Sequence, residues 1–311
     1  MEIKNNNILP KKTIFNGNSF ELLYSNPNLE IIKGNLKANT FDIIKPVYKS
    51  ESVKNIFILT GKIAVDYYQE KPLILSNNDT LTLTNKSNNH LFKAIEDTVI
   101  LVICNYQGFN QKMDQLEQLS NILTKLHQKD VKTKEHCLRV QQLTMKIADE
   151  LNIHNNLLSD LFYAACFHDV GKIAIPTEIL LKPGPLNDQE KEIIKKHPQI
   201  SYQMIKDILS NEASQMVFQH HERIDGSGYP QGLAGDKINL GAKIIAVADA
   251  YDALVTSRPY CGSMEVNEAI TILKQFESTH YDKQIINALI SRLKKITYWQ
   301  VNKIKIIYDS Y

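Results

Sequence analysis

The hydrophobic period of the chain changes near residue 108, and this change limits what each part can fold into. Before it, short runs of strand-favouring residues alternate with turn residues, and these runs are 56–59, 63–68, 73–75, 80–84 and 99–104. After it, apolar residues recur every three or four positions, first at Met113, Leu116, Leu119, Leu123 and Leu126. The sequence therefore predicts a β-rich domain over residues 1–107 and an all-α helical bundle over residues 108–311.

The closely spaced strands of residues 1–107 predict a small antiparallel barrel or sandwich, and the succession of strands and turns is similar to that of a cupin. A metal-binding cupin would need several histidines, and this region contains only His90. Two interpretations stay open, a ligand-sensing or dimerising module and a barrel that binds no ligand. We favour a regulatory role without assigning a ligand. The helical stripe after residue 108 could pair two copies into a homodimer, but it is short, and packing as the first helix of the bundle is preferred.

Bulk properties predict a soluble cytoplasmic protein. The formal charge of +2 gives no electrostatic case for binding a nucleic-acid polymer. The sequence contains no apolar run of about 20 residues, the length needed to span a bilayer. The first residues lack the apolar segment of a secretory signal. Its four cysteines show no C-x-x-C spacing and are expected to be reduced.

A histidine and an aspartate lie side by side where an apolar helical run ends, in the segment FYAACFHDVGK. Such a pair is more often an ordinary helix end, but it can also hold one divalent cation or bridge two. Since a carboxylate has two oxygens, Asp169 would be the bridge and His168 a terminal ligand. Lys172 lies one short turn further on, where its ammonium could meet a phosphate.

Other imidazole and carboxylate groups lie in or beside apolar helical segments, where they are costly unless paired or ligated. They are His136, His197, His220, His221 and Asp249. Five histidines and two aspartates are enough for two octahedral cations that share a carboxylate and a water. Their irregular spacing does not suit a structural zinc site. A glycine-rich loop, HHERIDGSGYPQGLAG, follows directly, and its Tyr229 could stack on a base.

These motifs together resemble the HD-GYP family of cyclic di-GMP phosphodiesterases, a branch of the HD-domain metal-dependent phosphohydrolases. The resemblance runs from about residue 119 to 293 and rests on the segments HDVGK, KPGPL, HHERIDGSGYPQGLAG, VADAYDAL and SRPY. It implies a metal-dependent enzyme that hydrolyses cyclic di-GMP to linear pGpG, with efficient cleavage through to GMP in members that bind three metals. It implies metal ligands at His136, His168, Asp169, His197, His220, His221 and Asp249. Asp169 and Lys172 would be catalytic, and substrate contacts would come from Lys172, Gly228, Tyr229, Pro230 and Arg258.

The resemblance further implies two divalent ions, iron or manganese. Family members with a third metal carry a glutamate four residues before the first ligand histidine, and that position here is Lys132. We therefore expect two ions and an enzyme that can stop at pGpG. Two alternatives stay open, a non-catalytic cyclic dinucleotide receptor and an HD hydrolase of another cyclic dinucleotide.

Overall fold

The computed structural model describes residues 12–15, 17–45, 47, 51–66, 71–256 and 264–294. The chain forms two compact units, residues 1–122 and 123–311, and each is described by itself. In the described residues, no helix has the length and apolar character needed to cross a membrane. Of the predicted helical bundle over residues 108–311, residues 257–263 and 295–311 lie outside the described residues.

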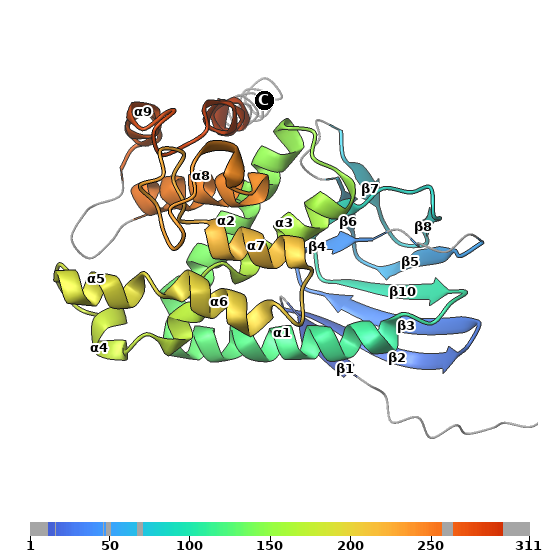
Figure 1. Ribbon diagram of the computed structural model, residues 1–311. Coiled ribbons are helices and arrows are strands. Elements are labelled where there is room, and N and C mark those ends of the chain that lie inside the picture. The colour runs from blue at the N-terminus through green and yellow to red at the C-terminus, as the bar shows by residue number, and fades with distance from the viewer. Residues whose placement is uncertain are drawn as a thin grey trace, which may run out of the picture. The chain divides into compact units, whose positions relative to one another are not determined.

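The first unit contains two antiparallel β-sheets (Figure 1). The six-stranded sheet has the order β1 (Lys12–Phe15), β2 (Asn18–Asn26), β3 (Leu29–Leu36), β10 (Thr98–Cys104), β5 (Lys54–Thr60) and β8 (Thr80–Leu83). The four-stranded sheet has the order β4 (Phe41–Ile44), β9 (His90–Ala94), β6 (Ile63–Val65) and β7 (Leu73–Leu75). The prediction of a small antiparallel barrel or sandwich followed by a helical bundle is confirmed.

One apolar core fills the space between the two sheets. Its buried side chains come from both of them, among them Ile58, Leu83, Ile63 and Phe92. Alternate residues of β3 point into the interior, as the two-residue period of a strand requires. This cluster and a smaller one around Leu22, Ile32 and Cys104 form the apolar interior of the unit, and no candidate metal group occurs among its described residues.

A buried carboxylate marks the end of the β-region. Glu30, which is 1% exposed, accepts hydrogen bonds from the backbone N–H groups of Gly108 (3.0 Å) and Phe109 (2.8 Å). Phe109 N is the first amide of α1 (Phe109–Lys129) and has no partner within the helix, and Gly108 directly precedes it. Helix α1 thus begins where the hydrophobic period changes, with its positive end facing a negative charge.

The second unit is helical. After α1 come α2 (Val131–Glu150), α3 (Asn155–Phe167), the 3₁₀ turn η1 (Val170–Ala174), α4 (Thr177–Leu180), α5 (Asp188–Ile194), α6 (His197–Ile205), α7 (Asn211–Gln219), η2 (Gly235–Lys237), α8 (Leu240–Val255) and α9 (Val266–Gln275). Residues 283–294 are also helical. Helix α2 packs on α3 and α8, and α6 packs on η1 and α7. The side chains of the candidate site come from α2 and α8, from the residues directly after α3 and α7, and from the short connection between α5 and α6, where His197 is the first residue of α6.

The start of α5 has a capping box formed by Asn187 and Glu190. Asn187 Oδ1 accepts from Glu190 N, and the Glu190 carboxylate accepts from Asn187 N, both at 2.9 Å. We expect Asn187→Ala to destabilise this helix by about 1 kcal/mol, the usual value of an N-cap side chain. Amide hydrogen exchange within residues 188–194 should then be about fivefold faster, and unchanged exchange there would contradict the prediction.

Candidate metal centre

Three histidines of the site lie at helix ends and share one hydrogen-bonding arrangement. His168 follows α3, His197 follows α5 closely, and His220 follows α7. Each Nδ1 donates to the backbone carbonyl three residues earlier, on Ala165 (2.9 Å), Ile194 (2.8 Å) and Val217 (2.6 Å). The last carbonyls of a helix lack intrahelical partners, so these imidazoles satisfy them. Because a carbonyl can only accept, Nδ1 carries the proton and Nε2 keeps a lone pair for a cation.

Asp169 lies at the centre of the site and is almost fully buried. Its Oδ2 faces Nε2 of His136 (3.5 Å) and of His168 (3.4 Å), whereas its Oδ1 faces Nε2 of His197 (3.2 Å). Ligand atoms bound to one cation at about 2.1 Å lie roughly 3 Å apart when they are at right angles. The two carboxylate oxygens are therefore turned to different imidazoles at separations that suit coordination.

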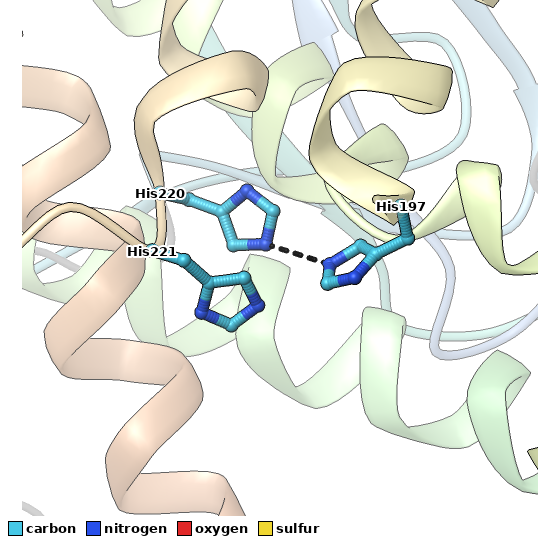
Figure 2. A group of neighbouring side chains, drawn as sticks. All are labelled: His197, His220 and His221. Carbon is cyan, nitrogen blue, oxygen red and sulfur yellow. Dashed lines mark hydrogen bonds between the residues drawn. The ribbon is translucent and has the colours of Figure 1, made fainter. Parts of the chain in front are cut away.

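The ligand atoms form two groups. One comprises His136, His168 and Asp169, and Asp249 Oδ1 lies 3.2 Å from His136 Nε2 beside it. The other comprises His197, His220 and His221. Figure 2 shows that these three rings turn toward one another, with Nε2 of His197 and His220 3.3 Å apart. Imidazole nitrogens and carboxylate oxygens suit divalent transition metals, so both groups could hold one.

The electrostatics of the site also suit a cation. His168 Nε2 is buried and has no hydrogen-bond partner, which is costly unless something binds it. Burial lowers the pKa of His220 and of His221 well below the ordinary value, so both imidazoles stay neutral. Burial would raise the pKa of Asp169, but Lys172 and His168 outweigh it and hold that pKa well below its usual range. The residues present therefore fit divalent ions.

His136 differs from the other histidines because three carboxylates surround it. Burial alone would lower its pKa, but hydrogen bonds with Asp169, Asp249 and Asp252 outweigh burial and raise the pKa to about 11. A cation that binds Nε2 must displace a proton from this imidazole. Metal uptake is therefore expected to release protons.

The segment after Asp169 is held tightly against α6. Lys172 Nζ donates to Asp169 Oδ2 at 2.5 Å. The Ser201 hydroxyl accepts from Gly171 N (2.7 Å) and donates to the His168 carbonyl (2.9 Å). Lys129, in the last turn of α1, donates through Nζ to the carbonyls of Ile173 and Ile175. The turn that carries Asp169 and Lys172 is thus fixed by partners on both sides.

A second buried carboxylate organises the glycine-rich loop. Glu222, 2% exposed, accepts from the backbone N–H groups of Gln231 (2.7 Å) and Leu233 (2.9 Å). A Cβ on Gly228 would lie 2.4 Å from Arg223 N, so this glycine is needed for the loop to pack on its own backbone. The loop brings the Tyr229 ring into a stack on His221, with centroids 4.8 Å apart.

We expect Glu222→Ala to loosen this loop and to leave the two groups of candidate metal ligands in place. Two buried N–H groups would lose their acceptor, at about 1–3 kcal/mol each. Amide hydrogen exchange at Gln231 and Leu233 should become at least about tenfold faster. Asp225→Ala is the matched control, because the Asp225 carboxylate bonds Ser227 in an exposed turn of the same loop. Equal effects of the two variants would contradict this role for Glu222.

Sequence reasoning and structure agree on which residues lie together. All seven residues expected to be metal ligands converge, and Lys172 and the Gly228–Tyr229–Pro230 loop lie beside them. Arg258 lies outside the described residues. Sequence reasoning missed Glu222, Arg139 and the hydroxyl contacts of Ser201, and for Asp252, one turn after Asp249, it leaves open a partner of a ligand or of a helix end. Burial of a charged side chain is the feature that reveals Glu222 and Asp252, and the sequence does not show burial.

Comparisons with known proteins identify relatives of this chain. The model of the HD domain family matches residues 112–285. A cyclic di-GMP phosphodiesterase of Thermotoga maritima is 30% identical over 86% of this chain and 69% of its own length. A 3'3'-cGAMP-specific phosphodiesterase of Vibrio cholerae is 34% identical over 62% of this chain and 46% of its own length. A solved RmlC-like cupin of Shewanella frigidimarina aligns over 36% of this chain and 96% of its own, with 11% identity and a TM-score of 0.29.

The helical unit and its histidine–aspartate cluster define a protein of the HD domain class. Within that class the chain belongs to the HD-GYP family of phosphodiesterases.

Proposed function

We propose that this chain is a metal-dependent phosphodiesterase that hydrolyses cyclic di-GMP. Residues 108–311 would be the hydrolase domain, and residues 1–107 would be a domain that regulates it. The observation that carries the proposal is the position of Asp169, whose two oxygens face different imidazoles. Membership of the family and the name of the Thermotoga maritima relative support the substrate.

The chain would hold two divalent ions, iron or manganese. One ion would be bound by His136, His168, Asp169 and Asp249, and the other by Asp169, His197, His220 and His221. Such ions, when bound, polarise phosphoryl oxygens and lower the pKa of water. Lys132 is exposed on the first turn of α2, which supports two ions rather than three. The main product would then be pGpG, with GMP formed more slowly.

The protein side chains would bind and orient the substrate. The Lys172 ammonium is partly exposed beside Asp169, where it can offset negative charge on a phosphate. Gly228, Tyr229 and Pro230 would line the space for a guanine, with the Tyr229 ring available for stacking. Arg258 would be a second contact to phosphate.

A second candidate substrate is another cyclic dinucleotide, because a relative with 34% identity is named for 3'3'-cGAMP. Metal-loaded full-length protein, incubated with each dinucleotide separately and in competition, distinguishes the candidates. We expect the higher kcat/KM with cyclic di-GMP, and pGpG should accumulate before GMP on a nucleotide column. Binding of cyclic di-GMP without turnover would instead support a receptor, and preference for 3'3'-cGAMP would change the substrate.

A further inference from the structure

One histidine of the site is oriented by a side chain rather than by the backbone. His168, His197 and His220 each donate Nδ1–H to a carbonyl at a helix end. His136 lies inside α2, where backbone carbonyls are engaged by amides four residues later. Its Nδ1 lies 2.8 Å from Asp252 Oδ2, so it donates to a carboxylate.

Asp252 is itself held in place. It is 1% exposed and lies on α8, three residues after Asp249, so that both carboxylates share a face of that helix. Arg139, one turn after His136 on α2, donates through Nε to Oδ1 (2.6 Å) and through Nη2 to Oδ2 (3.0 Å). This two-pronged contact fixes the plane of the carboxylate and compensates its charge.

We propose that Asp252, held in place by Arg139, is a positioning residue. It orients the His136 ring and thereby strengthens the binding of one of the two ions but not of the other. The inference rests on the proposed function in taking both groups of residues as metal sites. A carboxylate behind a metal-binding imidazole fixes its tautomer and ring orientation and increases its basicity. The group of His136, His168, Asp169 and Asp249 would depend on Asp252. In the other group, backbone carbonyls orient His197 and His220, so metal binding by that group would not depend on Asp252.

The test is titration of the metal-free, full-length protein with Mn²⁺, followed by electron paramagnetic resonance. Wild-type protein should bind two ions and give the signal of a magnetically coupled pair. Asp252→Asn preserves the shape of the side chain but removes its charge. We expect one ion to bind as in wild type, the other about 10–100-fold more weakly, and the signal of a single uncoupled Mn²⁺ at low metal.

Asp149→Asn is the matched control. Asp149 also lies on α2 and also pairs with an arginine, Arg292, but it contacts none of the proposed ligands. This variant should bind both ions with wild-type affinity, even if its stability falls. Arg139→Lys is a second, milder test, because Arg139 does not itself contact a proposed ligand nitrogen. It should weaken the same ion by a smaller factor than Asp252→Asn.

Three results would overturn the inference. The first is two coupled ions with wild-type affinity in both Asp252→Asn and Arg139→Lys. The second is equal weakening of both ions in either variant, and the third is fewer than two ions in wild-type protein. If wild-type protein binds two ions but leaves cyclic di-GMP intact, the proposed substrate is wrong while the role of Asp252 stands, so the two failures are distinguishable.

Discussion

Asp169→Ala is expected to lose the paired metal ions and the hydrolytic activity together. The carboxylate faces imidazoles of both groups, so its removal takes one ligand from each proposed site at once. It also leaves the Lys172 ammonium without the carboxylate to which it donates. Removal of even one group that stabilises a transition state typically costs about 10²–10³-fold, and this change removes more. We expect a decrease in kcat/KM of about 10³-fold or more.

Metal analysis of protein purified without oxygen, together with turnover of cyclic di-GMP, measures this effect. Asp188→Ala is the control, because the Asp188 side chain is exposed and pairs only with Lys191 in the contacts described. It should keep two ions and full activity. If Asp169→Ala kept two ions and wild-type turnover, the metal assignment would be wrong.

Gly171→Ala is expected to have the largest effect on stability. A Cβ at this position would lie 2.1 Å from the His197 carbonyl oxygen and 2.7 Å from Ser201 N. Both are backbone atoms of α6, which cannot move without displacing His197 from the site. Overpacking of this kind typically costs about 1–3 kcal/mol, and contact with backbone places this variant at the upper end. Metal binding should weaken as well, because His197 would shift.

Gly241→Ala provides the comparison. A Cβ there would also be crowded, but only by the thioether of Met216, whose flexible end can turn away. The midpoint of urea unfolding, followed by the far-ultraviolet helical signal, should fall much further for Gly171→Ala than for Gly241→Ala. Equal midpoints for the two variants would show that the turn after Asp169 is less rigid than its contacts indicate.

The fold could be predicted from the sequence where apolar residues follow one clear period. The strands β5, β6, β7, β8 and β10 correspond to the predicted runs, and α1 and α3 correspond to the predicted helical segments. Other strands were not assigned individually, because polar and charged residues interrupt their apolar pattern. In β3, for example, Lys33 and Asn35 occupy positions that are less buried than their neighbours. Burial in a sheet is decided by pairing with distant strands, which a local pattern does not contain.

In the candidate site, the metal ligands could be predicted from the sequence, but the residues that hold the ligands and the loop in place could not. Histidines and aspartates that interrupt apolar helices could be found directly, because burying them without a partner is costly. The division into two groups around Asp169 depends on how five helices meet, and no local pattern contains that. Glu222 and Arg139 were missed for a related reason. An acidic residue after two histidines and an arginine on a helix are both common on protein surfaces, and only packing distinguishes them.

The way in which three helices end has a consequence for how such a centre can arise. A histidine placed just after a helix donates Nδ1–H to a carbonyl in the last turn of that helix. The orientation of its ring is therefore set locally, without contacts from other helices. Each of these ligands is prepared locally, and assembly of the site requires only that the helix ends meet. The distance along the chain between one such histidine and the next is then free to vary with loop length. Only the four-residue neighbourhood of each helix end must be preserved.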